Sequence, residues 1–598
     1  MASIGASDGL VKRQMQVAVM VLSLNRPPVN ALDARLIAAL RTALAEAEAD
    51  AEVHAIVLAA EGAQFSAGID VSELGRVAGA ALPGLVAQIE GLRKPVVAAL
   101  QGNALGGATE VLLACHARVA HEGAWLGLPE VALGLMPVTG ATQRLPRLVG
   151  APVALNILLE GKVLSAVEAL AMGLLDAVVE DAPLARALGL AEGLSASVPV
   201  KTSDRRDGMR DPVAYQNAIA EARKRIEGWR LPAPAGLVDC VEAAQLLPFD
   251  MGLRFEQSHA EAMAETPEAA ALRYAFLAEK RALFPPAALT AHAPPKLGSL
   301  AILGTGGLAP DVARQALGAG FKVRLLAADR AGLTAALQAI AARQEALVAA
   351  GQLSAAAREA DWVRLTGVLA SDGIESADLI LATPEAPRLA DLPAPVVSLG
   401  GRGGFVLHAS PVAGGLATLA AAPDVPVPHQ ALVLALGRRL GWKVMVQGAG
   451  SALDQRLRQT LSRAIAVLES KGHARATIAA ALASYGLGAG GRMRLPAAPA
   501  NAPEILDFCM AALMNEGGKI LSEGAALRPS DVDAAALLTG LFPRWEGGPL
   551  YQADRTGLMA VRADLRRRAE ASPQLFTPAA VFDRLIGEGR RFEDLNRG

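Results

Sequence analysis

The sequence predicts a multidomain α/β protein of 598 residues, and three observations indicate this class. Single domains usually hold about 100–200 residues, so a chain of this length folds into several of them. Apolar residues make up 52% of the chain and charged residues 19%, enough to bury substantial cores. Short valine-rich runs alternate with longer alanine- and leucine-rich segments, which is the pattern of α/β domains.

Charge and cysteine content exclude several classes of protein. The 57 basic and 59 acidic side chains give a formal net charge of −2, whereas a dedicated nucleic-acid binder carries a basic excess. The three cysteines are widely spaced and form no CxxC pair, which excludes a disulfide framework and a zinc knuckle and indicates a reducing compartment.

The sequence carries no recognisable targeting signal or membrane span. Its first 16 residues lack the apolar core of a secretory signal, and its last four, LNRG, are not a peroxisomal address. The longest uncharged stretch, residues 403–423, contains two prolines and repeated glycines, so we expect no membrane span. We therefore expect a cytoplasmic protein.

The first 185 residues show the strand–turn–helix rhythm of an α/β domain. Asp33 is predicted to cap a long helix that ends near residue 50. Three apolar runs predict strands: 16–24, 55–60 and 94–100.

The remaining chain divides at proline-rich segments. Residues 190–295 are predicted to be mostly helical. From Ser299 the segment SLAILGTGGLAPDVARQALGAGFKVRLL predicts strand, glycine turn, helix and strand. The last 150 residues are predicted to be helices, with a loop rich in proline and alanine at 496–503.

Four motifs in the first 150 residues carry the main functional signal. In chain order they are FSAGID (65–70), QGNALGGATE (101–110), GLPEVALGLMP (127–137) and TQRLPRLVG (142–150). Together they resemble the crotonase, or enoyl-CoA hydratase/isomerase, superfamily over essentially the whole first domain. The resemblance implies a spiral ββα fold that binds an acyl-CoA thioester.

The resemblance also implies a role for individual residues. Glu110 would orient and activate a water molecule, and Glu130 would exchange the proton at the α-carbon. The N–H groups of Gly107 and Ile69 would hold the thioester oxygen. Hydration of an unsaturated thioester needs these groups, because two carboxyls divide the proton transfers and two N–H dipoles stabilise the oxyanion.

The FSAGID loop would line the coenzyme A site through Ala67, Gly68 and Asp70. A single glutamate after a glycine turn is usually a solvated charge at a helix start. The order of the motifs and the twenty positions between the two glutamates favour catalysis instead. Val138 and Ala141 replace family glycines after the second glutamate, which leaves the acyl substrate open.

The second half resembles a dehydrogenase. Gly304 and Gly306 lie in a GxGxxA turn between strand and helix, typical of dinucleotide-binding folds. Segments 504–533 and 540–554 resemble the final domain of the multifunctional enzymes of fatty-acid β-oxidation, and 236–281 resembles their linker. Those enzymes fuse a crotonase domain to a 3-hydroxyacyl-CoA dehydrogenase, so the resemblance covers nearly the whole chain.

Several dehydrogenase residues do not match the family. Ala327 stands where an acid would hold the ribose. The catalytic histidine of the family falls on Leu407, with His408 one residue out of frame, and its partner glutamate falls near Leu419. We therefore expect a degenerate dehydrogenase in which NAD binding is doubtful, and no metal site.

We expect five parts: a crotonase domain (1–185), a helical linker (186–296), a degenerate Rossmann-like domain (297–446), a shortened helical dehydrogenase domain (447–502) and a C-terminal helical domain (503–598). The expected function is reversible hydration of trans-2-enoyl-CoA to 3-hydroxyacyl-CoA, with double-bond isomerisation as a second activity. Hydration would need no cofactor beyond the coenzyme A of its substrate. Three alternatives stay open: a bifunctional hydratase–dehydrogenase, another crotonase reaction, and a non-catalytic CoA-binding subunit.

Overall fold

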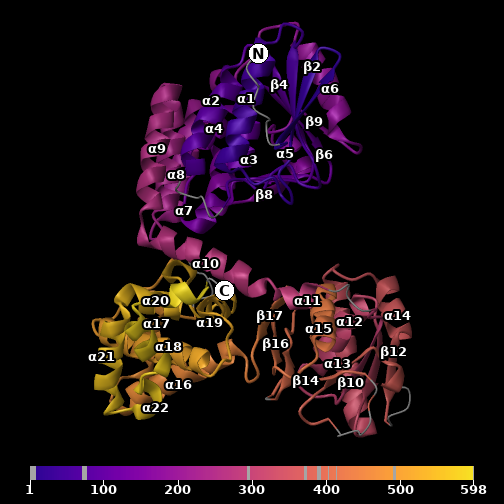
Figure 1. The fold of residues 1–598 in the computed structure, drawn as a ribbon, viewed down its shortest axis with the longest axis vertical. Coiled ribbons are helices and arrows are strands. Elements are labelled where there is room, and N and C mark those ends of the chain that lie inside the picture. Colours follow the sequence, from indigo (N-terminus) through magenta and orange to yellow (C-terminus); the bar gives the residue numbers. More distant parts are fainter. Residues whose placement is uncertain are drawn as a thin grey trace. The chain divides into compact units, whose positions relative to one another are not determined.

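The computed structural model describes residues 9–70, 77–291, 296–369, 374–386, 392, 394–401, 403–412, 414–488 and 493–596. The chain divides into two compact units, Met1–Arg273 and Tyr274–Gly598. The division falls within helix α10 (Pro267–Leu283) (Figure 1).

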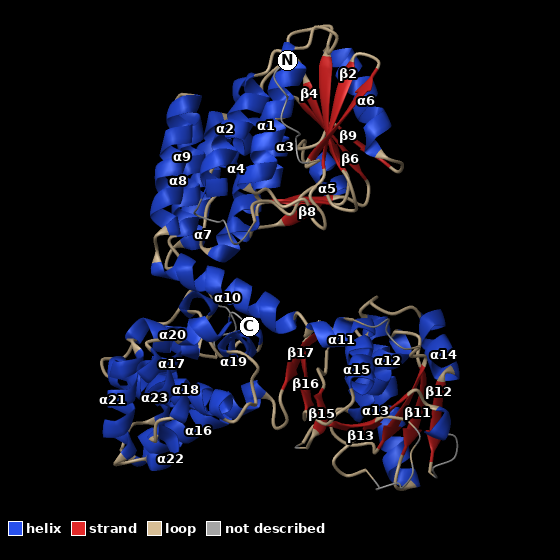
Figure 2. Ribbon diagram, in the orientation of Figure 1, coloured by secondary structure: helices blue, strands red, loops and turns tan. Residues whose placement is uncertain are grey.

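The first unit is built on a six-stranded sheet in the order β1-β2-β3-β4-β6-β9. The β1–β2 pair is antiparallel and all the other neighbours are parallel. A small sheet, β5-β7-β8, lies beside it (Figure 2). The strands are β1 (Val11–Gln16), β2 (Val19–Leu24), β3 (Ala55–Ala60), β4 (Val96–Leu100), β5 (Asn103–Leu105), β6 (Ala117–His121), β7 (Trp125–Gly127), β8 (Val163–Ser165) and β9 (Ala177–Val179).

Helices cover both faces of the large sheet. Alternate residues of a strand face opposite sides, so Val57 packs with α6 while its neighbours Ile56 and Leu58 pack with the helices on the other face. Helices α7, α8 and α9 contact α4, so the first unit continues beyond residue 185. The helices are α1 (Ala34–Ala49), α2 (Val77–Gly91), α3 (Gly107–Ala114), α4 (Ala141–Glu160), α5 (Ala166–Ala171), α6 (Pro183–Leu194), α7 (Pro212–Ile226), α8 (Ala233–Leu246) and α9 (Phe249–Ala264), with 3-10 turns η2 (Pro129–Leu133), η3 (Thr202–Asp204) and η4 (Asp207–Met209).

Most of the local predictions for this unit are confirmed. The carboxylate of Asp33 accepts a hydrogen bond from the Leu36 N–H at 2.8 Å, which caps α1. The predicted strands 55–60 and 94–100 correspond to β3 and β4. The strand predicted at 16–24 is confirmed from Val19 as β2, but it starts later than predicted, because the chain reverses at Val17, whose φ is +56°, and pairs an additional strand, β1, with β2 as a hairpin.

The second unit begins with an eight-stranded sheet in the order β12-β11-β10-β13-β14-β15-β16-β17. Only the β15–β16 pair is antiparallel. The predicted strand–helix–strand opening is confirmed as β10, α12 and β11. The elements are β10 (Ser299–Leu303), β11 (Lys322–Leu326), β12 (Leu365–Val368), β13 (Leu379–Ala382), β14 (Val396–Leu399), β15 (Phe405–His408), β16 (Leu416–Ala421), β17 (Lys443–Gln447), α11 (Ala287–Thr290), α12 (Ala309–Gly318), α13 (Arg330–Ala349), α14 (Ala355–Val363), η5 (Ile374–Ser376) and α15 (Val427–Arg439).

The C-terminal part of the second unit is helical, as predicted, and shares one apolar core that includes Phe508, Phe576 and Phe582. The predicted loop at 496–503 ends earlier, because α18 begins at Ala502 with Pro503 in its first turn, where the missing N–H has no helical partner. The helices are α16 (Leu453–Ser470), α17 (Arg475–Tyr485), α18 (Ala502–Ser522), α19 (Pro529–Leu538), α20 (Pro549–Thr556), α21 (Leu558–Ala569), α22 (Pro573–Phe576) and α23 (Ala580–Glu588), with 3-10 turns η6 (Arg544–Glu546) and η7 (Phe592–Asn596).

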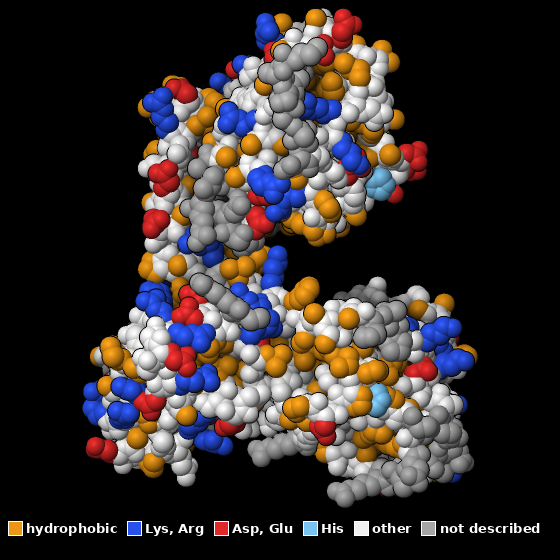
Figure 3. Space-filling view, viewed as in Figure 1, with side chains coloured by type: hydrophobic (Ala, Val, Ile, Leu, Met, Phe, Trp, Pro, Cys, Tyr) orange, Lys and Arg blue, Asp and Glu red, His pale blue; other side chains and the backbone are white. Residues whose placement is uncertain are grey.

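Charges on the C-terminal helices are mixed rather than uniformly basic, as Figure 3 shows. Arg562 and Arg566 pair with Asp583, and Arg567 and Arg568 pair with Asp564.

Among the helices of the described residues, none combines the length and the apolar composition that a bilayer crossing requires.

Candidate active site

Glu110 lies in the first turn of α3, directly after the glycine pair. Gly106 precedes this helix with φ +55°, a backbone conformation that favours glycine, and its N–H donates to the Gly127 carbonyl at 2.8 Å. The Thr109 hydroxyl lies within hydrogen-bond distance of the Ala104 and Gly127 carbonyls. These contacts fix the start of α3 against β5 and β7 and set the position of Glu110.

The carboxylate of Glu110 faces the turn after the second predicted glutamate. It accepts hydrogen bonds from the N–H groups of Thr139 at 2.8 Å and Val138 at 3.5 Å. The side chain is buried, and burial raises its pKa while the hydrogen bonds from Thr139 oppose the rise. Glu110 is therefore held by donors that favour its ionised form.

Glu130 lies in the 3-10 turn η2 and has a different environment. Its Oε2 is buried and has no hydrogen-bond partner among the described residues. A Cβ built on Gly106 would lie 2.8 Å from Oε1 of Glu130, so the Glu130 carboxyl faces the glycine turn that precedes α3. Burial raises the pKa of Glu130 to about 8, and the negative charge of Glu110 adds to this shift. Glu130 therefore keeps its proton at neutral pH.

The two residues predicted to supply the oxyanion N–H groups, Gly107 and Ile69, lie in contact. Gly107 is the first residue of α3, so its N–H has no partner within the helix. A Cβ on Gly107 would lie 3.1 Å from Cγ1 of Ile69, and a Cβ on Gly68 would lie 3.5 Å from the Gly107 nitrogen. The FSAGID loop and the glycine turn are thus in contact, and larger residues would separate them.

The other two loop residues make backbone contacts with the segment after β2. The Ala67 N–H donates to the Val29 carbonyl at 3.0 Å, and the Asp70 N–H to the Leu32 carbonyl at 3.3 Å. The Asp70 carboxylate lies 3.6 Å from the guanidinium of Arg26. The structure therefore holds this loop in place, but Asp70 points to an arginine of its own chain.

A third buried carboxylate, Glu256, was missed from the sequence. It lies on α9 and accepts hydrogen bonds from the Gly140 N–H at 2.5 Å and from the N–H and hydroxyl of Thr142 at 2.9 and 2.5 Å. Among the described residues of α9, the buried ones are Gly252, Glu256 and Ala260, spaced four apart. An acid on such a stripe of small residues is the signal that could have found it.

An arginine completes the contacts to this turn. Arg144 of α4 is buried and pairs with Glu90 at 2.6 Å. Its guanidinium also donates to the Thr139 carbonyl. The segment between Pro137 and Thr142 is therefore held by α3, α4 and α9 together.

The glycine turn of the second unit is occupied by a side chain of its own domain. The Gly306 N–H donates to the carboxylate of Glu385 at 2.8 Å, and a Cβ on Gly304 would lie 1.8 Å from the Thr383 hydroxyl. Asp329, the acid nearest the end of β11, accepts from the Gly332 N–H at 2.7 Å and caps α13. An acceptor therefore already holds one N–H of the turn.

The two positions expected to carry the dehydrogenase proton relay lie opposite each other. Leu407 of β15 pairs with Leu419 of β16, and both side chains are fully buried in one apolar core. His408 points elsewhere, with its Nε2 3.4 Å from the Gly450 carbonyl, and burial lowers its pKa.

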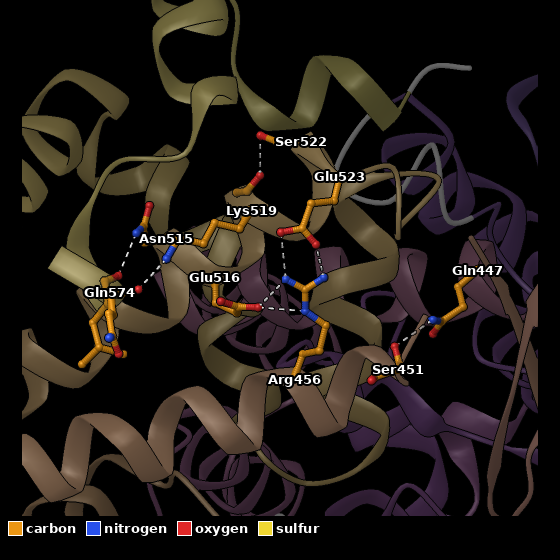
Figure 4. Close-up of polar contacts among 11 residues, drawn as sticks. Gln447, Ser451, Arg456, Asn515, Glu516, Lys519, Ser522, Glu523 and Gln574 are labelled. Carbon is orange, nitrogen blue, oxygen red and sulfur yellow. Dashed lines mark hydrogen bonds and ion pairs between the residues drawn. The ribbon is translucent and has the colours of Figure 1, made fainter. Parts of the chain in front are cut away.

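Arg456, near the start of α16, forms ion pairs with two glutamates of α18. Its guanidinium lies 2.7 Å from Glu516 and 2.5 Å from Glu523 (Figure 4). On α18, Lys519 donates to the Gln574 carbonyl at 2.7 Å, and Asn515 donates to the Leu575 carbonyl at 2.7 Å. These contacts join helices of the C-terminal core and leave Arg456 a structural residue.

Among the described residues no group of three or more histidine, cysteine, aspartate or glutamate side chains is arranged to hold a metal ion.

Comparisons with known proteins match both halves of the chain. Residues 14–224 match the family described as "Enoyl-CoA hydratase/isomerase". Residues 299–388 match "3-hydroxyacyl-CoA dehydrogenase, NAD binding domain". The family resemblances predicted from the motifs are therefore confirmed.

Three relatives illustrate the similarity. The "Peroxisomal bifunctional enzyme" of Danio rerio is 38% identical over 280 residues, which cover 46% of this chain and 38% of that protein. The "Fatty acid oxidation complex subunit alpha" of Shewanella amazonensis is 35% identical over 288 residues, which cover 45% and 40%. The "Probable enoyl-CoA hydratase" of Bacillus subtilis is 42% identical over 171 residues, which cover 27% and 66%.

The match thus spans less than half the length of the two larger relatives. The chain thus carries an enoyl-CoA hydratase/isomerase region followed by a 3-hydroxyacyl-CoA dehydrogenase NAD-binding region, and it is similar over part of its length to proteins named peroxisomal bifunctional enzyme and fatty acid oxidation complex subunit alpha.

Proposed function

We propose that the first unit hydrates trans-2-enoyl-CoA to 3-hydroxyacyl-CoA through Glu110 and Glu130. One observation carries the proposal: the two buried carboxyls lie around the same glycine turn and differ in their hydrogen-bond partners. Glu110 accepts two backbone N–H groups, which favours its ionised form. Glu130 has a buried oxygen without a partner among the described residues and a pKa of about 8, which favours its protonated form. Such a pair divides the roles of base and acid.

The proposed reaction moves one proton at each carboxyl. Glu110 takes a proton from water while the water oxygen bonds to the β-carbon of the thioester. The electrons of the double bond move to the thioester oxygen, which the N–H groups of Gly107 and Ile69 hold. The enolate then takes the proton of Glu130 at its α-carbon, and proton transfer from Glu110 restores both groups. Glu130 and the same oxyanion site would also support double-bond isomerisation.

We further propose that the second unit does not oxidise the product. The apolar Leu407–Leu419 pair supports this, because a buried leucine pair supplies no base for a hydroxyl proton. The contact of Glu385 with the Gly306 N–H also supports it, since a carboxylate there competes with a pyrophosphate for the same donor and repels it. As they stand, these residues do not fit a bound dinucleotide.

We also propose the five domain ranges given above, with the crotonase segment ending near 185 and the linker helices α7, α8 and α9 packed against its helix α4. We also keep a cytoplasmic location, which the three free, buried cysteines support because a reducing compartment keeps thiols unpaired.

The test combines the full chain, a short trans-2-enoyl-CoA and NAD, followed at the enoyl-thioester and NADH absorbances. Loss of the enoyl signal without NADH is expected. Glu110→Gln and Glu130→Gln should each lower kcat by about 10²–10⁴-fold, with thioester binding retained in calorimetry. Glu122→Gln, an exposed glutamate between them, is the matched control.

Each alternative predicts a different result. NADH formation would show a bifunctional enzyme. Release of free coenzyme A would indicate thioester hydrolysis. Binding of acyl-CoA without any turnover, unchanged in both glutamine variants, would indicate a non-catalytic CoA-binding subunit.

A further inference from the structure

Glu256 is buried beside the two proposed catalytic carboxyls, yet it comes from a helix far along the chain. It lies on α9, and its carboxylate accepts three hydrogen bonds, from the Gly140 N–H and from the N–H and hydroxyl of Thr142. Three donors on one buried carboxylate favour its ionised form. A buried acid with no role would cost stability, so its presence needs an explanation.

The hydroxyl of Thr142 is oriented toward Glu256 by a further contact. The Gln143 side-chain amide donates to the Thr142 oxygen at 3.0 Å and to the Cys240 carbonyl of α8 at 2.9 Å. Because the Thr142 oxygen accepts from this amide, its own hydrogen is available to Glu256, 2.5 Å away. The network therefore connects α4, α8 and α9.

Glu256 and Glu110 hold two sides of one turn. Glu110 accepts from Thr139, and Glu256 accepts from the next residue, Gly140, and from Thr142. Arg144 donates to the Thr139 carbonyl in between. A shift of the turn that frees Glu256 would move the Thr139 N–H, which donates to Glu110 at the shorter of its two backbone distances, 2.8 Å.

We infer that Glu256 is a positioning residue for hydration, which fixes the 137–142 turn against Glu110 and places a negative charge beside Glu110 and Glu130. The inference rests on the proposed hydratase function. It assigns a role in that reaction to a helix outside the segment that carries the four motifs.

The electrostatics agree with this geometry. Burial and the charge of Glu110 raise the pKa of Glu256 to about 7, and Glu256 in turn helps to raise the pKa of Glu130. The other groups that face this site are the Cys240 thiol from α8, whose pKa burial raises, and Arg144 from α4, whose positive charge acts on Glu110. Removing the charge of Glu256 should therefore lower the pKa of Glu130.

The test compares Glu256→Gln with Glu261→Gln in the full chain. Glu261 lies on the same helix and is exposed, so it is a matched control. For Glu256→Gln we expect kcat for hydration to fall about 10-fold or more, with KM within about 2-fold, because an amide replaces one acceptor by a donor that faces an N–H. The alkaline limb of the pH profile should move to lower pH, because Glu130 would lose its proton earlier.

Thr142→Val and Thr142→Ser keep the inference testable if Glu256→Gln does not fold. The valine variant removes only the hydroxyl donor and should lower kcat by a smaller factor, and the serine variant should restore it. The thermal unfolding midpoint is measured for every variant.

The outcomes separate the two proposals. Wild-type hydration with unchanged kcat and pH limbs in Glu256→Gln overturns the inference and leaves the proposed function standing. A fall in kcat that follows the unfolding midpoint, with both pH limbs unmoved, makes Glu256 a residue of the fold alone and also overturns it. Absence of hydration in the wild type overturns the proposed function and the inference together.

Discussion

Glu130 should make the first unit less stable as the pH rises, and Glu130→Gln should remove this effect. The ordinary pKa of a glutamate is 4.5, whereas the buried carboxyl of Glu130 has a pKa of about 8. Below pH 4.5 the folded and unfolded chains both hold the proton. Between these two values the unfolded chain releases the proton that the folded chain keeps, so unfolding becomes more favourable with rising pH.

The size of this stability change follows from the pH range between the ordinary and the raised pKa of Glu130. Each pH unit within it changes the free energy of unfolding by about 1.4 kcal/mol, so the two units from pH 5 to pH 7 give at most about 2.7 kcal/mol. Glu130 is partly exposed although its Oε2 is buried, and the charge of Glu110 supplies part of the shift, so we expect about 2 kcal/mol. Any constant cost of the buried glutamine amide cancels, because only the change with pH is compared.

Hydrogen exchange of β3 and β4 measures this free energy, because these fully buried strands exchange only when the unit opens. The wild type should lose stability relative to Glu130→Gln between pH 5 and pH 7, and Glu122→Gln should follow the wild type. A difference that stays constant over this range would refute the reasoning. It would mean that Glu130 is ionised at neutral pH and cannot supply the α-carbon proton.

Two further predictions follow from the glycine turns. Gly106→Ala should lower kcat for hydration at least about 10-fold, because its Cβ would lie 2.8 Å from the Glu130 carboxyl at a φ of +55°. Gly62→Ala, with positive φ but open space, is the control, and equal activity of both variants would contradict the proposed position of Glu130. Glu385→Ala should raise the affinity for NAD, measured by titration calorimetry, because it frees the Gly306 N–H. The variant should still form no NADH. NADH formation would show that a base other than the residue at position 407 serves the second unit.

Local sequence patterns predicted the elements of the fold well. Apolar runs and the Asp33 cap are short-range signals, and they located β3, β4 and α1. The β1–β2 hairpin was missed because β1 is mostly exposed and polar, and its turn is formed by Val17 in a conformation rare for valine. A turn without glycine, proline or asparagine gives no local signal.

The motifs predicted the site residues that lie within them and missed those outside them. The structure brings Gly107, Ile69, Glu110 and Glu130 around one glycine turn. Glu256 escaped prediction because its role depends on how α9 packs against α4, a contact between segments more than a hundred residues apart. Only a tertiary structure shows that such an acid is buried beside two others.

The two units treat buried charge in opposite ways, and this contrast supports the assignment of activity. Replacing a buried polar pair by well-packed apolar residues is often neutral or stabilising, so the leucine pair at 407 and 419 favours the fold of the second unit without providing chemistry. The first unit instead keeps three carboxyls buried together, each with a pKa raised by burial. Leucines or glutamines at those positions would avoid the free-energy cost of burying ionisable carboxyls. We propose that catalysis accounts for the buried acids of the first unit, because hydration would use an ionised Glu110 beside a protonated Glu130.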